Sequence, residues 1–235
     1  MAHFSFLSIL RGAQAYKKVG LSTLALAVCA GAAHADELVV NGDFSLGNAD
    51  FGTDYTYIPY DYSNYNDTAQ VQNGDYTVGY HVPPSYFDWY PFHDVSGDGQ
   101  MMVVAGGSDA SDPFWDETIN VDPNTDYTIS FYVAEISTPG INADVAVDID
   151  GVELGDGVAP YTQDDWEQYS FTWNSGTDTS IALSLTDLQT NGDENDFAVD
   201  NISMTGPGSS SVPGPSAFIA MGMPLAATLR RRLRR

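Results

Sequence analysis

Residues 144–151 read Asp-Val-Ala-Val-Asp-Ile-Asp-Gly, and this stretch decides the fold class. Valine or isoleucine at positions 145, 147 and 149 alternates with polar or small residues, which is the period of a half-buried β-strand. The pair Asp150-Gly151 follows directly, and Asp-Gly is a strong signal for the tight turn of a β-hairpin. The stretch therefore predicts an antiparallel hairpin with one buried face and one solvent-exposed face.

The same period of two recurs along the chain. Large apolar residues occupy the odd positions of 169–173 and of 181–185, and residues 127–133 form a β-branched and aromatic run. No ten-residue stretch between 36 and 206 has the 3.6-residue period of a helix. Short strands separated by Gly, Asn and Asp clusters predict an all-β sandwich, and a jelly roll is the version we favour.

The final segment of this region contains a change of phase. Phe197 and Val199 lie at odd positions, whereas Ile202 and Met204 lie at even positions. All four can face one core only if the strand contains an extra residue at Asp200-Asn201, because neighbouring side chains point to opposite faces. We therefore expect a β-bulge there.

Charge is segregated along the chain. The eight Lys and Arg residues lie before residue 19 or after residue 229, and all 32 Asp and Glu residues lie between them. Such a domain repels nucleic acid, which excludes that class of partner. Its acidity has two interpretations. The surface is adapted to high salt, or its negative charge attracts divalent cations.

Residues 1–35 have the pattern of a secretory signal peptide. Three basic residues precede a small and apolar run over 19–33, and Ala33-His34-Ala35 supplies the small residues that signal peptidase reads. Cleavage after Ala35 would remove Cys29, the only cysteine, so we expect an exported protein without a disulfide.

The other end combines a linker with a short apolar segment. Residues 207–211 are Gly- and Ser-rich, and Val212-Pro213-Gly214-Pro215 precedes apolar residues 217–229 and an arginine cluster. Thirteen helical residues reach only about 20 Å, short of the ~30 Å hydrocarbon core. The arginines would hold this end on the cytoplasmic side of a membrane.

Residues 212–235 resemble a PEP-CTERM sorting signal, with Gly214 in the place where Glu is typical. The resemblance implies processing by an exosortase near Val212, Pro213 and Pro215, transient membrane association through 217–235, and a final location at the cell envelope surface or in extracellular matrix. A plain marginal membrane anchor is the alternative.

The domain at 36–206 also carries a resemblance. Residues 39–45 (Val-Val-Asn-Gly-Asp-Phe-Ser) and 197–203 (Phe-Ala-Val-Asp-Asn-Ile-Ser) resemble the bracketing strands of galactose-binding-like, carbohydrate-binding-module jelly rolls. That resemblance implies a structural Ca²⁺ where the first and last strands meet, with Asp200 as a ligand. Ser45 stands in place of the usual Glu, so Asp43, Asp98 or Asp196 is expected to substitute. Alternatively, Asp200 only satisfies backbone groups at the bulge.

Aromatic residues are concentrated in residues 51–92, which hold nine of the 14 tyrosines. A tyrosine ring tolerates half exposure, and a sugar presents an apolar C–H face, so Tyr55, Tyr57, Tyr60 and Trp89 are candidates for a glycan platform. The alternative is that these rings pin a long surface loop onto the sandwich.

The composition of the domain gives little support for catalytic activity. After removal of residues 1–35 the domain has no Cys, Lys or Arg, and only His81 and His93 are available as bases near neutral pH. We therefore expect a non-catalytic exported protein that binds extracellular polysaccharide. The runner-up is a structural matrix or surface component without a discrete glycan site.

Overall fold

The computed structural model describes residues 35–59, 71–82, 93–97, 99–137, 142–160, 162, 165–190 and 195–207. Within them no helix is present, and the strands are β1 (Asp36–Glu37), β2 (Thr56–Tyr57), β3 (Asp75–Gly79), β4 (Met101–Ala105), β5 (Pro113–Asn120), β6 (Asp126–Glu135), β7 (Asp144–Ile149), β8 (Val152–Val158), β9 (Glu167–Asn174), β10 (Ser180–Asp187) and β11 (Asp196–Gly206). Residues 1–34 and 208–235, with most of the predicted signal peptide, linker and sorting signal, lie outside the described residues.

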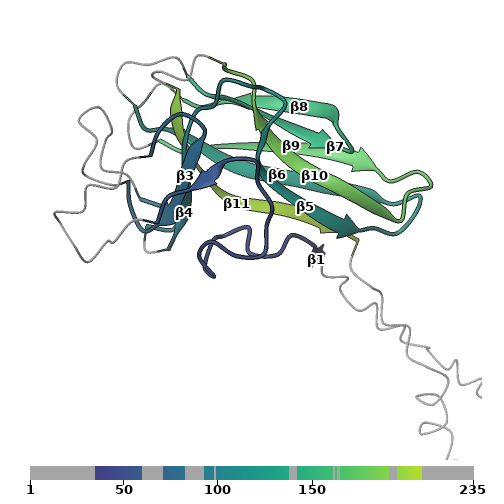
Figure 1. Ribbon diagram of the computed structural model, residues 1–235. Coiled ribbons are helices and arrows are strands. Elements are labelled where there is room, and N and C mark those ends of the chain that lie inside the picture. Colours follow the sequence, from purple (N-terminus) through teal and green to yellow (C-terminus); the bar gives the residue numbers. More distant parts are fainter. Residues whose placement is uncertain are drawn as a thin grey trace, which may run out of the picture. The chain divides into compact units, whose positions relative to one another are not determined.

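The strands form two sheets that face each other (Figure 1). Sheet A has the order β2-β3-β4-β11-β6-β9, with β1 also paired to β11, and sheet B has the order β5-β10-β7-β8. From β4 onward the chain passes repeatedly from one sheet to the other, and only the β7–β8 hairpin stays within its sheet. This alternation is the connectivity of a jelly roll, so the predicted all-β jelly-roll sandwich is confirmed.

The main core lies between the sheets. Val145 and Val147 of β7 and Leu183 of β10 are fully buried there, as the alternating pattern predicts. Asp150 and Gly151 both have positive φ angles, 51° and 74°, which confirms the tight hairpin turn between β7 and β8.

A smaller apolar layer covers part of the opposite face of sheet A. It contains residues of β4, the end of β6 and the start of β11, together with two residues from the preceding segments: Met101, Val103, Ala105, Ala134, Ile136, Ala198, Val71 and Val82. Trp166 packs against this layer. The outer face of sheet A is therefore covered near β4, whereas its part over β6, β9 and the second half of β11 has no such layer among the described residues.

The predicted first bracketing strand is placed differently. The strand that pairs antiparallel with β11 is β1, in which Asp36 lies opposite Gly206 and Glu37 opposite Thr205. Residues 39–45 instead form a turn, because Asn41 and Phe44 have positive φ angles of 58° and 51°. These backbone conformations interrupt a ladder, so the expectation of a strand at 39–45 is wrong.

The predicted bulge in the last strand is confirmed. The pairing of β11 with β6 shifts between Asp200 and Ser203, and Asn201 has a φ of 50°. The shift lets Phe197, Val199, Ile202 and Met204 all lie in the core between the sheets.

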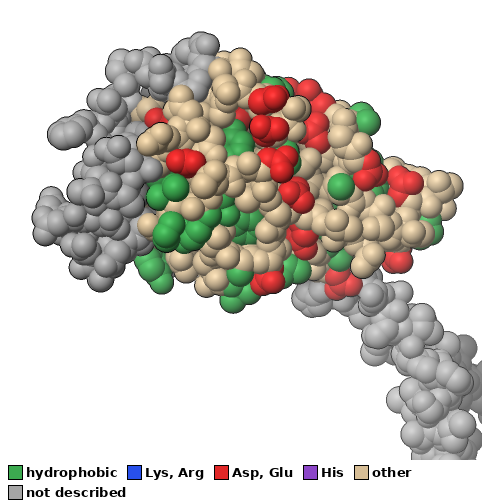
Figure 2. Space-filling view, in the orientation of Figure 1, with side chains coloured by type: hydrophobic (Ala, Val, Ile, Leu, Met, Phe, Trp, Pro, Cys, Tyr) green, Lys and Arg blue, Asp and Glu red, His purple; other side chains and the backbone are tan. Residues whose placement is uncertain are grey.

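The described surface is acidic. Figure 2 shows Asp and Glu side chains distributed over the sandwich and a gathering of hydrophobic side chains on the side of β2, β3 and β4. No helix among the described residues is long and apolar enough to span a membrane.

Candidate functional site

A polar groove lies on the open part of the outer face of sheet A. Its volume is about 530 Å³, and its walls come from β1, β6, β9, β11 and the 39–45 turn. The lining residues are Glu37, Val39, Asn41, Gly42, Asp43, Ser130, Tyr132, Gln168, Asn201, Ile202 and Ser203. We call this the sheet A groove.

The strand period explains which side chains enter the groove. Ile129, Phe131 and Val133 of β6 point into the core, so Ser130 and Tyr132 point to the opposite face. Tyr132 lies opposite Asp200 of β11 on one side and Gln168 of β9 on the other. The half-buried Tyr132 therefore has Asp200 and Gln168 as its cross-strand neighbours, and Gln168 lines the groove with it.

Glu37 closes one side of the sheet A groove. Its Oε2 accepts a hydrogen bond from Ser203 Oγ at 2.5 Å, and its Oε1 accepts bonds from the N–H groups of Met204 (2.9 Å) and Val39 (3.0 Å). These bonds hold an exposed carboxylate in one position beside the groove, because each of its oxygens is engaged by β11 or by the segment after β1.

The floor of the sheet A groove is fixed by the contact between the 39–45 turn and the bulge. The N–H of Ile202 donates to the carbonyl oxygen of Gly42 at 2.9 Å. A Cβ atom at position 42 would lie 1.8 Å from the Ile202 carbonyl oxygen, so only glycine permits this approach.

Asp200 directly precedes the groove residue Asn201 in β11 and is only 2% exposed. Its Oδ2 accepts the N–H of Val95 at 2.9 Å, and its Oδ1 accepts the N–H of Asn201 at 2.7 Å. Burial raises the pKa of Asp200 to about 7; the two amide hydrogen bonds oppose this, and the charges of Asp94 and Asp43 add to it. The charges of Asp94 and Asp43 thus act on Asp200, and the domain has no Lys or Arg to offset them.

Asp94 organises the loop that reaches Asp200. It accepts hydrogen bonds from the N–H groups of Ser96 (2.9 Å) and Gly99 (2.9 Å) and from Ser96 Oγ. Burial alone would raise the pKa of Asp94, but these bonds together outweigh it, so its pKa is lowered. Asp94 was not among the sequence candidates, and its turn-forming spacing to Ser96 was the only available signal.

The predicted calcium ligands are only partly brought together. Asp43 lies close enough for its charge to raise the pKa of Asp200, and Asp98 lies outside the described residues. Asp196 is four residues from Asp200 on one strand, roughly 13 Å at about 3.3 Å per residue, so the two cannot hold one ion. Among the described residues, no three His, Cys, Asp or Glu side chains converge as a metal-binding group.

The predicted glycan platform is not assembled as expected. Tyr55 is 7% exposed and packs in the core against Phe114, so its ring faces are closed to a sugar and its assignment is corrected. Tyr57 is 36% exposed and lies 5.3 Å from the ring of Tyr76. Tyr60 and Trp89 lie outside the described residues.

Comparison with known proteins adds fold-level likeness only. No protein-family model matches the chain, and no curated protein matches it by sequence. The Stig cyclase Fisc from Fischerella sp. TAU is similar over 74% of this chain and 100% of its own, at 15% identity and a TM-score of 0.49.

Two sugar-related structures are also similar. The CBM22-1–CBM22-2 tandem domain of Xyn10C from Paenibacillus barcinonensis matches 79% of this chain and 49% of its own, at 14% identity and a TM-score of 0.45. The C-terminal domain of EclA, described as a sugar-binding protein, matches 41% of this chain and 69% of its own, at 15% identity and a TM-score of 0.37. At these identities the likeness concerns the sandwich and not its ligand.

Proposed function

We propose that this protein is a non-catalytic, exported β-sandwich that binds a glycan of extracellular polysaccharide in the sheet A groove. The observation that carries the proposal is the position of Tyr132, whose ring stands between polar groups of two neighbouring strands in a groove of about 530 Å³. An aromatic ring can stack on the apolar face of a sugar, and the amide, hydroxyl and carboxylate groups around it can bond the hydroxyl rim.

The chemistry of the sheet A groove favours a neutral sugar. Glu37 and Asp43 bring negative charge, Gln168 and Asn201 bring amides, and the domain has no Lys or Arg. A uronate or sulfate group would meet unscreened carboxylates there, since no cationic side chain is available to pair with it.

A glycan array tests this function. The full chain should give selective hits, and replacing Tyr132 or Gln168 with Ala should weaken the best hit by at least about tenfold, equivalent to about 1.4 kcal/mol. Thr172→Ala is the matched control, because Thr172 is an exposed residue on the same face of β9. Unchanged binding by Tyr132→Ala would refute the assignment of the groove.

We further propose that Ca²⁺ is held beside the groove by Asp200 and Asp43. The support is chemical: a buried carboxylate without a cationic partner lies next to a second carboxylate, and Ca²⁺ accepts mixed carboxylate and carbonyl oxygen ligands. Such an ion would tie the 39–45 turn to the last strand and so stabilise the groove.

Export and sorting are part of the proposal and rest on the sequence. Signal peptidase would release the chain at Asp36, and an exosortase-type enzyme would remove the arginine tail near residues 212–216. The measurement is the intact mass of the envelope-associated or secreted protein. Retention of residues 217–235 in that form would contradict the sorting proposal.

A structural matrix role is the second candidate. It is favoured by the packing of aromatic residues from the tyrosine-rich region, because Tyr55 and Tyr76 are buried and Phe51 packs edge-on against Tyr76. If the array gives no hit that depends on Tyr132, this second function is the better account. In both cases we expect no turnover of glycans or esters, and a rate abolished by replacing one carboxylate or His81 would overturn that expectation.

A further inference from the structure

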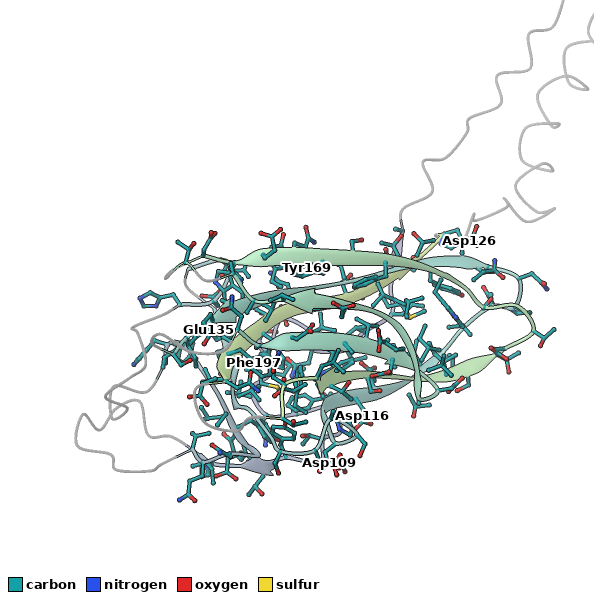
Figure 3. All side chains as sticks on the ribbon, turned by 90° about the horizontal axis from the view of Figure 1, so that it is seen from above. Asp109, Asp116, Asp126, Glu135, Tyr169 and Phe197 are labelled. Carbon is teal, nitrogen blue, oxygen red and sulfur yellow. The ribbon has the colours of Figure 1, made fainter. Side chains whose placement is uncertain are left out.

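Another buried carboxylate, Asp187, lies where β10 ends and β11 begins. Asp187, the last residue of β10, is 1% exposed, and Asn195, immediately before β11, is fully buried. Figure 3 shows the same end through Glu135 and Phe197, which are paired across β6 and β11 and lie opposite the end marked by Asp126.

The amide of Asn195 is packed directly against this carboxylate. Its Nδ2 donates to Asp187 Oδ2 at 2.6 Å and to the carbonyl oxygen of Gln189 at 2.9 Å. The main-chain N–H of Gln189 donates to Asp187 Oδ1 at 3.0 Å. Asp187 is therefore held in one orientation.

The oxygen of the same Asn195 amide has no hydrogen-bond donor. Asn195 Oδ1 is buried and accepts no hydrogen bond. Because Oδ1 and Nδ2 are attached to one carbon, this orphaned oxygen lies beside the Asp187 carboxylate. A buried acceptor without a donor costs about 1–3 kcal/mol, so native structures almost always supply a partner, which for an oxygen is a donor, a water or a cation.

The charge of Asp187 also has no partner. The charge that acts on Asp187 is that of Asp144, which is also acidic, and the domain has no Lys or Arg. Burial of a carboxylate charge is strongly unfavourable, and the hydrogen bonds from Asn195 and Gln189 offset only part of that cost, so a bound proton or metal ion would stabilise the group. In the amide orientation of this structure, with Asn195 Nδ2 directed at Asp187, a proton on Asp187 leaves Asn195 Oδ1 without a donor, whereas a cation can be bound by both oxygens.

We propose that Asp187 and the side-chain oxygen of Asn195 hold a divalent cation, with Ca²⁺ as the ion that best fits an all-oxygen donor set. This ion would join the end of β10 to the start of β11 and so connect sheet B to sheet A. The site is separate from the one proposed at Asp200, which lies five residues from Asn195, roughly 16 Å along the strand.

The test is the Ca²⁺ stoichiometry of the full chain, measured by equilibrium dialysis and calorimetry with Asp187→Asn, Asp200→Asn, the double variant and Asp122→Asn. Asp122 is an exposed acid at a turn and controls for the loss of one charge. We expect Asp187→Asn to bind one Ca²⁺ ion fewer per chain than the unaltered protein, whether or not Asp200→Asn also loses an ion. Asp122→Asn should bind as many ions as the unaltered protein. Unchanged stoichiometry in Asp187→Asn overturns the proposal, whereas loss confined to Asp200→Asn supports only the first site.

Stability and amide exchange provide independent readouts. In EDTA at pH 8, Asp187→Asn should be at least as stable as the native chain, because it removes an uncompensated charge and its new amide can donate to Asn195 Oδ1. In the unaltered chain, Ca²⁺ should slow hydrogen exchange at the Gln189 amide, which reports the Asp187 site, separately from Val95, which reports Asp200. Slowing at Val95 without slowing at Gln189 would overturn the proposal even if the variant failed to fold.

Discussion

Gly42 and Ile202 are joined by a backbone hydrogen bond of 2.9 Å, although 160 positions separate them in the chain. The bond connects the turn after β1 to the residue that follows the bulge of β11. The part of the sheet A groove formed by the 39–45 turn and β11 therefore depends on one contact between the two ends of the domain, and the bulge turns the Ile202 N–H toward the turn.

Replacing Gly42 with Ala should destabilise the domain strongly. The added Cβ would lie 1.8 Å from the Ile202 carbonyl oxygen, which is main chain and cannot move aside alone. Chemical denaturation should show a loss above the roughly 1 kcal/mol expected for Gly74→Ala, where φ is 83° but no atom lies within 4 Å of the added carbon. A loss equal to that of Gly74→Ala would contradict the packing described here.

In the absence of metal, stability should fall as the pH rises through neutrality. Burial raises the pKa of Asp187 and of Asp200 from 3.8 to about 7. A raised folded-state pKa means that the folded protein holds these protons more tightly, so their contribution is complete below about pH 4 and is lost as the pH passes 7. Urea denaturation in EDTA at pH 5 and pH 8 measures the free energy of unfolding, which should be lower at pH 8.

The variant Asp200→Asn should flatten this pH dependence, because an amide does not titrate. Asp94 acts in the opposite direction, since its lowered pKa makes a contribution that is present above its unfolded pKa and lost on acidification below it. A domain that is equally stable at pH 5 and pH 8, in both the native chain and the variant, would mean that the two buried acids do not control the profile.

Calcium should raise the melting temperature through Asp200. An ion that binds only the folded state adds about 2.7 kcal/mol at a hundredfold excess over its Kd. Thermal melts with Ca²⁺ and with Na⁺ at equal ionic strength separate binding from screening. If Asp200→Ala retains the full Ca²⁺ increment when Asp187 is also replaced by Asn, neither carboxylate holds the ion.

Tyr55 should affect stability and leave glycan binding unchanged. Its ring is buried against Phe114, and its hydroxyl oxygen accepts the N–H of Gly107 at 3.0 Å. Tyr55→Ala should cost about 3–5 kcal/mol, as for other large aromatic residues removed from a core, and Tyr55→Phe about 1–3 kcal/mol because the Gly107 N–H loses its acceptor. Loss of glycan hits in a folded Tyr55→Phe protein would restore Tyr55 as a ligand-binding residue.

The features that could be predicted from the amino-acid order alone are those that depend on neighbouring residues. Alternation at 145–149 specified a strand with one buried face, and Asp150-Gly151 specified the turn after it, because both are set by backbone geometry over a few residues. The change of phase between Val199 and Ile202 was sufficient to locate the bulge, since only an extra residue returns both side chains to the same face.

Which side chains from distant segments come into contact could be seen only in the folded protein. Tyr132, Gln168 and Glu37 come from three separated strands, and no spacing in the chain indicates that they share a groove. The tyrosine-rich composition around Tyr55 predicts a sugar platform, but this ring is buried against Phe114 of β5 in sheet B. Likewise, Asp196 and Asp200 are close in sequence but are separated along an extended strand. Asp187 and Asn195 are joined by a hydrogen bond because the end of β10 lies beside the start of β11. Period and turn chemistry act within a few residues, but burial and the meeting of side chains depend on sheet order, which is set by contacts between distant segments.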